Sequence, residues 1–392
     1  MIKRYIEKLT NGKINGDGPC DIQVLDKRFY KELLFKGSLG LGEAYVKKYW
    51  DVEDLYALDV KLLSSPVIKG LSGSIWPGDI FSFLKEKLSF VSLDKAKSNV
   101  QFHYDIGNEF YEAMLGKTMQ YTSAYFTAKK MSLNKAQLRK CEIIADKLKV
   151  SPGCTVLEIG CGWGTFAKYL AEEKGCDVTA ITLSDQQYKY CKENCSTVSN
   201  GKVQFFQTDF RETSNYIKPQ QNKFDRIVGV GTIAHFVPMF SALVNIITSQ
   251  LKDGGLALID DVCRDTTCRR FTPSQSAWTN KYIFPGTQFF SPDQITQKFR
   301  KKLIIEQWNT DRTYYRDTCL AWLLNIKTKW EEICKIGNYD EEFYRTWEYY
   351  LSSAAAGFES GFLGQWQILL SKMSSPYKKT VRLQSHGGRI KF

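Results

Sequence analysis

Long apolar runs are missing from this 392-residue chain, and histidine and proline are scarce, with three and ten residues respectively. No apolar run approaches the roughly 20 residues that a membrane-spanning helix needs. The amino-terminal segment MIKRYIEKLTNGK has no apolar core of the length found in secretory signal peptides. We therefore expect any contact with a membrane to be peripheral.

The eleven cysteines are scattered, without a Cys-x-x-Cys pair and without histidine companions. An odd number at irregular spacing argues against both a disulfide framework and a structural zinc site. We therefore expect no bound metal, and a reducing, cytoplasmic environment. The chain also has no internal repeat and no low-complexity segment.

Aromatic residues, in contrast, make up 14% of the chain and hydrophobic residues 43%, which is enough for a sizeable core and excludes wholesale disorder. The length favours two domains, one larger than the other. A total of 54 Lys and Arg against 42 Asp and Glu leaves a net charge of +12. Such a charge favours a polyanionic partner, which is nucleic acid, an anionic membrane surface or an acidic substrate.

Helical patterning in short pieces characterises residues 1 to 85, and we predict a small, mainly helical domain there, with helices over Asp26–Phe35 and Leu41–Trp50. A Lys-rich stretch follows, so we place a linker at residues 86 to 100. Residues 101 to 392 then form the larger domain.

Short apolar segments alternate with helical segments from Cys154 onward. The predicted strands are VLEI, DVTAIT, VQFFQT, FDRIVGV and LALIDD, and the predicted helices are TFAKYLAEEK, DQQYKYCKENC with Ser184 as its N-cap, and Met239–Leu251. This repeated βα unit predicts an α/β fold with a mainly parallel, doubly wound sheet, in which ligands bind at the carboxyl ends of the strands. The aromatic-rich segment Trp322–Trp366 is predicted to be helical, and Trp366–Ser371 is a candidate last strand.

The segment EIGCGWG places Gly160, Gly162 and Gly164 directly after a predicted strand and before a predicted helix. Without a Cβ atom, the backbone there can turn sharply and approach a ligand. The spacing differs from the dinucleotide pattern GxGxxG. Glu158, together with the lack of an acidic residue at the end of the second strand, favours S-adenosylmethionine over NAD. The alternative is a glycine turn that serves packing alone.

Three further segments accompany this loop: His103–Leu115 (HYDIGNEFYEAML), Met119–Phe126 (MQYTSAYF) and Asn280–Gly286 (NKYIFPG). With TLSDQQ, QWQILLS and the amino-terminal DIQVLDKRFYKELLFKGSLGLGEAYVKKYWDVEDL, they make the chain resemble the cyclopropane-fatty-acyl-phospholipid synthase family, which includes the mycolic acid cyclopropane synthases. The resemblance covers nearly the whole length, and its amino-terminal part favours the full-length phospholipid type over the shorter mycolate enzymes.

The resemblance implies a class I methyltransferase fold with a Rossmann-like sheet. It implies S-adenosylmethionine-dependent transfer of a methylene to the double bond of an unsaturated phospholipid acyl chain. The implied cofactor-binding residues are Tyr121 and Thr122 at the methionine end, Glu158, Gly160 and Gly162 in the loop, Thr182 and Gln187 at the ribose, and Asp209 and Phe210 at the adenine. The implied residues around a bound bicarbonate are His235 and Tyr315, with a backbone contact from Ile283. Two positions depart from the family, because Ser123 stands where the family has Cys and Ala234 where it has Glu.

The departure at Ala234 matters because an isolated alkene attacks only a strongly electrophilic methyl group, and the attack leaves a carbocation. Ring closure then requires a base that removes a proton from the transferred methyl, while water is excluded. In the family this base is bicarbonate, and the Glu orients the His and accepts a hydrogen bond from bicarbonate. Ala234 can do neither, whereas Ser123 keeps a donor. Loss of one such contact costs about 2.7–4 kcal/mol of barrier.

Aromatic faces would stabilise the carbocation by about 0.5–2 kcal/mol each. The candidate walls are Tyr104, Tyr121, Tyr125, Phe284 and Tyr315. Each can equally be a core residue, and for Phe284 core packing is the favoured interpretation.

Three outcomes follow from the missing carboxylate at Ala234. The enzyme still forms the cyclopropane ring, slowly, with His235, Tyr315 and Ser123 around the bicarbonate; this is the leading interpretation. Alternatively, it methylates the alkene without closing the ring, or it binds cofactor and lipid with little turnover. Ala234 itself is either natural or engineered. Methyltransferases that act on alkaloid or sterol-like acceptors share the cofactor loop, so such an acceptor stays open.

We assign the amino-terminal domain and the linker to docking on an anionic membrane surface and to homodimer contacts, because the chain is basic and the implied substrate is a bilayer lipid. This hypothesis places the protein in the cytoplasm, peripherally associated with the inner face of the membrane. No nucleic-acid-binding motif with interleaved aromatic residues is present, so nucleic acid is not the expected partner. We expect His103 to fix the turn of its own segment and His386 to be exposed.

Overall fold

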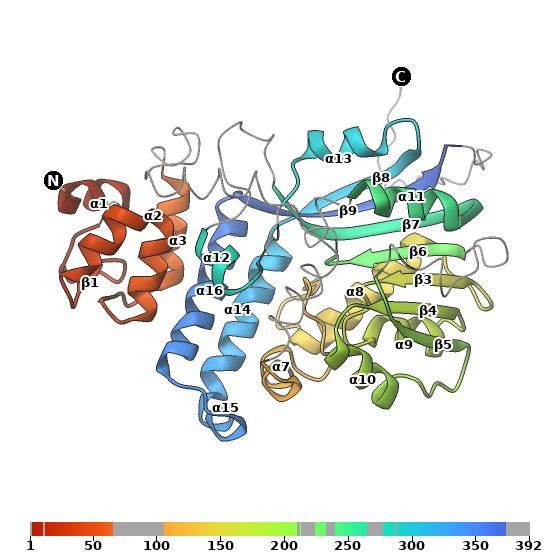
Figure 1. Ribbon diagram of the computed structural model, residues 1–392, viewed down its shortest axis with the longest axis horizontal. Helices are drawn as coiled ribbons and strands as arrows, with labels where there is room; N and C mark the ends of the chain where they lie inside the picture. The colour runs from red at the N-terminus through yellow and green to blue at the C-terminus, as the bar shows by residue number, and fades with distance from the viewer. Residues whose placement is uncertain are drawn as a thin grey trace.

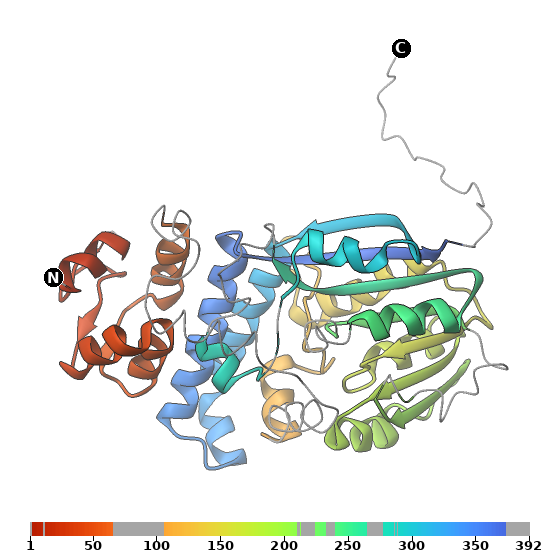
Figure 2. The ribbon, with the colours of Figure 1, turned by 45° about the horizontal axis from the view of Figure 1, so that its top comes forward.

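The computed structural model describes residues 2–10, 12–65, 106–209, 212, 224–232, 240–264, 277–285, 287 and 289–373. The amino-terminal helices lie at one end and the large sheet at the other (Figure 1). Two long helices, α14 (Thr313–Thr328) and α16 (Glu341–Glu359), lie between them, and α3 (Leu55–Ser64) packs on α16 (Figure 2). The predicted boundary at residue 85 and the linker 86–100 lie outside the described residues and stay predictions.

The amino-terminal part is mainly helical, as predicted. Besides α3 it contains α1 (Ile2–Thr10), α2 (Arg28–Val46) and a two-stranded antiparallel ribbon of β1 (Gln23–Val24) and β2 (Trp50–Asp51). The two predicted helices are both present within α2, which joins them across a kink, but the second ends at Val46 and not at Trp50. The chain kinks at Gly37, which has φ 58° and ψ −131°, and continues as helix to Val46. Trp50 belongs to β2, where its indole N–H donates to the carbonyl oxygen of Leu41 at 3.0 Å.

Seven strands form the large sheet in the order β5-β4-β3-β6-β7-β9-β8. Their bounds are β3 (Thr155–Ile159), β4 (Asp177–Thr182), β5 (Lys202–Gln207), β6 (Phe224–Val230), β7 (Leu251–Arg264), β8 (Leu303–Asp311) and β9 (Leu363–Lys372). Strands β3 to β7 are parallel, while β9 runs antiparallel to both β7 and β8. The α/β class and the candidate last strand are confirmed, whereas β8 was not predicted.

Eight further helices surround the sheet and the α14–α16 pair in the described part of the chain. They are α7 (Asn108–Leu115), α8 (Leu133–Leu148), α9 (Thr165–Glu172), α10 (Asp185–Asn194), α11 (Phe240–Gln250), α12 (Ala277–Tyr282), α13 (Pro292–Phe299) and α15 (Trp330–Ile336). Ser184 caps α10 as predicted, because its hydroxyl accepts the backbone N–H of Gln187 at 3.2 Å. None of the helices in the described ranges is long and apolar enough to cross a bilayer.

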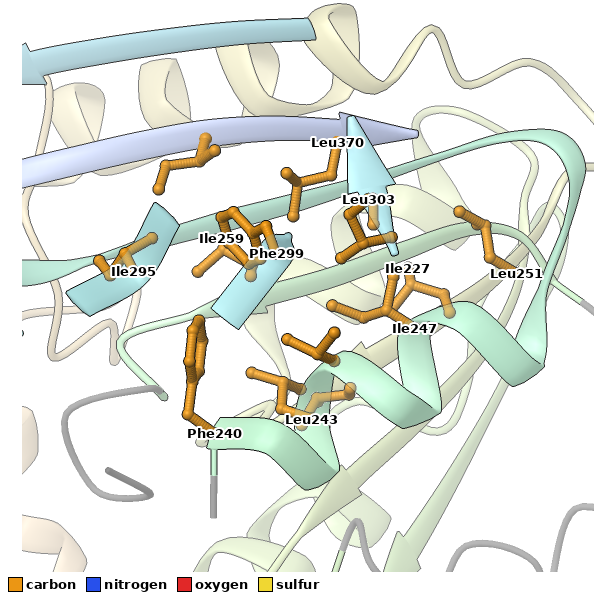
Figure 3. Packing of buried hydrophobic residues seen from close by; sticks show 14 of the residues in the cluster. Ile227, Phe240, Leu243, Ile247, Leu251, Ile259, Ile295, Phe299, Leu303 and Leu370 are labelled. Atoms are coloured by element: carbon orange, nitrogen blue, oxygen red, sulfur yellow. The ribbon is translucent and has the colours of Figure 1, made fainter. Parts of the chain in front are cut away.

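Hydrophobic clusters fill both faces of the sheet. On one face, Phe240, Leu243 and Ile247 of α11 pack against Ile227 of β6 and Ile259 of β7 (Figure 3). On the other face, α8, α9 and α10 pack against β3, β4 and β5. The nearly continuous runs of buried residues in β3, β4 and β6 are consistent with a sheet that is covered on both sides, as its parallel topology requires.

A third cluster joins the amino-terminal helices to the rest of the molecule. Trp278 of α12 and Tyr349 of α16 pack with Phe29, Trp50 and other residues of the amino-terminal part. Gly42 makes this contact close, since a Cβ atom there would lie 2.4 Å from the indole of Trp278. We call this contact the helical junction.

Charged groups at the helical junction are buried with partners of opposite charge. Arg345 of α16 lies over the ring of Tyr45, donates to the carbonyl oxygens of Tyr45 and Trp50 at 2.7 and 3.1 Å, and pairs with Asp51 at 3.3 Å. The carboxylate of Glu43 forms ion pairs with the ammonium groups of Lys36 and Lys281 at 2.7 Å each. It also accepts a hydrogen bond from the hydroxyl of Tyr282 at 2.8 Å.

Candidate active site

The glycine loop lies at the carboxyl edge of the sheet, between β3 and α9. Gly160 and Gly162 have φ of 73° and 56°, in the left-handed region that favours glycine. A Cβ atom on Gly160 would lie 2.3 Å from Cγ2 of Thr232, whereas one on Gly162 would meet no described atom within 4 Å. The backbone N–H groups of Gly160 and Cys161 both donate to the carbonyl oxygen of Ile181 at 2.9 Å. The loop therefore turns tightly at Gly160 and is open at Gly162.

The predicted ribose and adenine residues lie at the ends of the two neighbouring strands. Thr182 ends β4, and its hydroxyl donates to Oε1 of Gln187 at 2.8 Å. Asp209 follows β5 and is buried. Phe210 lies outside the described residues. The structure thus brings Thr182 and Gln187 into direct contact at the edge where the glycine loop lies.

The segment around Thr122 is held over this edge by α8. Gln137 donates from its amide to the carbonyl oxygens of Gln120 and Thr122 at 3.2 and 2.9 Å. Lys140 donates to Oγ1 of Thr122 at 2.5 Å. A Cβ atom on Gly231, just after β6, would lie 2.6 Å from Cγ2 of Thr122. The predicted methionine-end residue is therefore held between α8 and the end of β6.

Aromatic rings surround Tyr121, the neighbour of Thr122. Its ring centroid lies 5.1 Å from that of Trp322, 5.7 Å from Tyr111 and 6.0 Å from Phe284. Tyr315, a predicted bicarbonate residue, stacks on Phe358 at 4.5 Å. These rings form a largely buried aromatic wall beside the cofactor edge.

One hydrogen bond links the segments that carry Ser123 and Tyr315. The backbone N–H of Ala124 donates to Oγ1 of Thr318, which follows Tyr315 by one turn on α14, at 2.8 Å. Ser123 itself is buried, and its hydroxyl donates to the carbonyl oxygen of Ala124 at 3.3 Å. Burial is the main cause that raises the pKa of Tyr315 well above its usual value, and acidic neighbours that include Asp261 raise it further.

Other predicted bicarbonate residues are not brought to this place by described contacts. The backbone N–H of Ile283 donates to the carbonyl oxygen of Thr279 at 3.0 Å, and its side chain packs in the cluster of the helical junction. His235 and Ala234 lie outside the described residues, as do Tyr104, His103 and His386. The bicarbonate site therefore stays a prediction.

Two ionisable groups are buried below the segment that carries Thr122. Burial raises the pKa of Glu158 in β3 to about 8, and the positive charge of Lys140 opposes this shift. Burial lowers the pKa of Lys140 to about 8, against opposing charges that include Asp260 and Glu158. Within the described part of the chain, Oε2 of Glu158 is buried without a hydrogen-bond partner. Lys140 and Gln137 were missed from the sequence because α8 was not predicted, although their i, i+3 spacing puts both on one helix face.

A buried carboxylate on β7 was also missed. Asp260 accepts the hydroxyl of Tyr125 at 2.9 Å and the side-chain amides of Gln365 and Gln367 at 2.6 and 2.9 Å. The signals were an acidic residue at the end of the predicted strand LALIDD and two glutamines with strand spacing in QWQ. Tyr125, which was predicted to line the site with its aromatic ring, thus also positions the carboxylate of Asp260 through its hydroxyl.

Comparisons with known proteins identify the family of the chain. A family model described as mycolic acid cyclopropane synthetase matches residues 91–368. The cyclopropane-fatty-acyl-phospholipid synthase of Escherichia coli (strain K12) is 32% identical over 366 residues, which cover 92% of this chain and 90% of that protein. The tuberculostearic acid methyltransferase UfaA1 of Mycobacterium tuberculosis is 28% identical and covers 87% of this chain and 80% of its own length.

Solved structures share the fold. The cyclopropane synthase MmaA2 from Mycobacterium tuberculosis is 23% identical with a TM-score of 0.63, over 70% of this chain and 98% of that one. Coclaurine N-methyltransferase is 18% identical with a TM-score of 0.68, over 85% of this chain and 99% of that one. The family predicted from the sequence segments is thus confirmed, and the chain belongs to the mycolic acid cyclopropane synthetase family.

Proposed function

We propose that this chain is an S-adenosylmethionine-dependent C-methyltransferase that converts the double bond of an unsaturated phospholipid acyl chain into a cyclopropane ring. The observation that carries the proposal is the 32% identity with the Escherichia coli synthase, which extends over 92% of the chain. That coverage is more than the sheet and its helices can supply alone, so the likeness to a phospholipid enzyme includes amino-terminal residues.

The residues at the sheet edge fit S-adenosylmethionine. Gly162 leaves the loop open on one side, where a Cβ atom would meet no described atom. Glu158 presents a buried oxygen without a partner among the described residues, and Thr182 and Gln187 offer hydroxyl and amide groups at the next strand end. S-adenosylmethionine would be held by these groups together with Thr122, and would supply an electrophilic methyl on a sulfonium.

The aromatic wall supports the chemistry that follows methyl transfer. Tyr121, Tyr315 and the tightly packed Trp322 form a surface of π faces beside the edge, which stabilises positive charge on the lipid and excludes water. Ser123 supplies a buried hydroxyl next to this wall. The residues therefore favour an acceptor that is apolar and uncharged before it reacts.

Docking of the enzyme on an anionic membrane is part of the proposal. The outer face of α2 carries exposed Lys27, Arg28 and Lys31, followed at helical spacing by Leu34 and Phe35. Phe35 is 68% exposed. Basic residues that flank exposed apolar ones suit the interface of an anionic bilayer, where each basic residue contributes roughly 1 kcal/mol. The homodimer contact stays a prediction.

The docking surface can be tested by co-sedimentation with vesicles. Exchange of Leu34 and Phe35 for Ser should reduce binding to phosphatidylglycerol vesicles, and high salt should reduce it further. Leu324→Ser is the matched control, because Leu324 is 60% exposed on α14. Equal binding to neutral phosphatidylcholine vesicles, or equal losses in the two variants, would refute this surface.

The activity itself is tested by mass spectrometry and proton NMR of lipids after incubation with S-adenosylmethionine and vesicles of unsaturated phosphatidylglycerol. Gain of one CH2 with loss of the alkene supports cyclopropanation. Gain of CH2 with retained unsaturation shows methylation without ring closure, and no change leaves a binding protein.

Ala234→Glu in parallel tests the bicarbonate hypothesis. If it changes neither turnover nor the dependence on bicarbonate, the proposed importance of that position is wrong.

A further inference from the structure

Asp260 is 2% exposed, and among the described residues its carboxylate meets only neutral donors. Its Oδ2 accepts hydrogen bonds from the hydroxyl of Tyr125 and the side-chain amide of Gln367. Among the described residues, its Oδ1 accepts one hydrogen bond, from the side-chain amide of Gln365. A carboxylate offers about four acceptor positions, so one position on Oδ1 remains for a further hydrogen. The three donors are themselves buried, which fixes the direction of the carboxylate.

No cation pairs with Asp260 in the described part of the chain. Lys147 donates to Oε1 of Gln367 and to Asn309, so the amide of Gln367 separates this ammonium from the carboxylate. Lys140 is directed at Thr122 instead. The charge of Asp260 acts on Lys140 and Lys147 from a distance, but no group that contacts the carboxylate in the described part of the chain carries a positive charge. Burial of a carboxylate without a cation in contact is costly, by several kcal/mol in folded proteins. The site therefore favours a ligand that brings one positive charge.

Described contacts place Asp260 beneath the reacting edge. Its backbone oxygen accepts the N–H of Gly231 at 2.7 Å, and Gly231 is the residue whose Cβ would collide with Thr122. Tyr125 is three residues after Thr122 and stacks on Tyr314, which precedes Tyr315. The carboxylate thus lies among the segments that hold the methionine end and the aromatic wall.

We propose that Asp260 is the enzyme's own anionic base, which balances the positive charge during the reaction and accepts the proton at ring closure. This inference rests on the proposed function. The alkene π electrons form a bond to the methyl carbon while the sulfur–carbon bond breaks and its electron pair stays on sulfur. One C–H bond of that methyl then breaks, its pair closes the ring at the cationic carbon, and the proton moves to Oδ1 of Asp260.

A weak base is sufficient for this step, because a proton beside a carbocation is strongly acidic. Position and exclusion of water are what the protein must supply. The same unit of positive charge lies on the sulfonium, then on the lipid and finally on the proton, so one fixed anion stabilises every stage. A second anion such as bicarbonate would be repelled by Asp260. Ring closure should therefore proceed without bicarbonate, in contrast to the bicarbonate mechanism that the resemblance implies, and without the carboxylate that Ala234 lacks.

The first test is binding, which does not depend on turnover. Calorimetry compares the affinity for S-adenosylmethionine, which carries the sulfonium charge, with that for the neutral thioether S-adenosylhomocysteine. Asp260→Asn should reduce the preference for the sulfonium by roughly tenfold or more, since one charge is removed from a low-dielectric site. Affinity for the thioether should change little, which also shows that the variant folds.

The second test is the product distribution in buffer depleted of carbon dioxide. Wild-type enzyme should close the ring there, and Asp260→Asn should lower ring formation by roughly 100-fold or more, with open methylated lipid in its place. Formate should restore ring closure to Asp260→Gly. Asp225→Asn is the matched control, because Asp225 lies at the amino end of β6, where it accepts Thr155 and Lys252. It should leave the product distribution unchanged.

Normal ring closure by Asp260→Asn, or a wild-type enzyme that closes the ring only when bicarbonate is added, would overturn the role of Asp260 alone. Tyr125→Phe, which removes one donor but keeps the ring, guards against a variant that fails to fold. It should lower the share of cyclopropane product without loss of thioether binding. A wild-type enzyme that releases no S-adenosylhomocysteine with any unsaturated lipid would instead refute the proposed function, and the inference with it.

Discussion

The helical junction and the carboxyl edge of the sheet both bury ionisable side chains, but they treat the charge differently. At the junction, Arg345 and Glu43 each meet opposite charges and further hydrogen bonds. At the edge, Asp260 and Lys140 meet neutral donors or acceptors, and Oε2 of Glu158 meets none among the described residues.

The pKa values express the same difference. Burial raises the pKa of Glu43, but hydrogen bonds from Lys281, Lys36 and Tyr282 outweigh it and bring the value to about 2. For Glu158, burial dominates and the pKa rises to about 8. Paired charges fix the helical domain in place, whereas ionisable groups at the edge have no contacting partner of opposite charge, so their charged forms are unfavourable until a charged ligand is present. Each prediction below tests one side of this contrast.

The largest effect is expected at Arg345. Arg345→Met should lower the free energy of unfolding by about 3–5 kcal/mol, because it leaves two buried carbonyl oxygens and Asp51 without their donor. Urea denaturation followed by circular dichroism measures this. Arg28→Met is the control, since Arg28 is exposed in its pair with Asp26 and its loss should cost far less stability than that of Arg345. Similar losses in the two variants would mean that the junction charges are not structural.

Glu158 should make stability depend on pH in an unusual direction. Its pKa in the folded state is raised, so the folded protein keeps a proton that the unfolded chain has lost between about pH 4.5 and 8. This contribution is complete below pH 4.5 and is lost as the pH rises towards 8. Glu158→Gln should remove the loss, so that its stability relative to wild type improves by roughly 2 kcal/mol between pH 6 and 8.

Denaturation of both proteins at the two pH values provides the measurement for Glu158. Glu142→Gln, an exposed carboxylate on α8 that pairs with Arg139, is the matched control. Parallel pH profiles for wild type and Glu158→Gln would show that the edge does not hold an unpaired carboxyl group.

A comparison of alanine substitutions at Gly162 and Gly153 distinguishes the effect of backbone strain from the effect of contact with the ligand. Both have positive φ, of 56° and 80°, and a Cβ atom on either would meet no described atom within 4 Å. Alanine at either position should cost about 1–2 kcal/mol of stability through its backbone conformation. Only Gly162→Ala should also weaken binding of S-adenosylhomocysteine, by roughly tenfold, because its methyl group would enter the space open to the ligand. Unequal stability losses with equal affinities would contradict this assignment.

The smallest effect is expected from Lys281. It is half-exposed, and Glu43 would keep Lys36 and Tyr282 in its absence. Lys281→Met should therefore lower the free energy of unfolding by about 1 kcal/mol or less. Lys189→Met, on the exposed surface of α10, should cost still less. A loss at Lys281 as large as that at Arg345 would mean that the partners of Glu43 do not substitute for one another.

The sequence was sufficient for features that depend on neighbouring residues. Strands β4 and β6 have the predicted bounds, and Ser184 caps α10, because alternation and capping are local signals. Strand β8 was missed, since it is an edge strand whose side chains are mostly exposed and lack a clear alternation. The Asp260 site was also missed, because Tyr125 and Gln365 lie 135 and 105 residues away along the chain.

The place of β9 in the sheet has a consequence for how the protein is made. This strand comes after all the others in the chain, yet it lies between β7 and β8 and provides Gln365 and Gln367. During synthesis, the edge of β7 that pairs with β9 therefore has no partner strand until residue 372 has left the ribosome. Until then the carboxylate of Asp260 lacks two of its three donors, so this buried site is complete only after a strand more than 100 residues further along the chain has been synthesised.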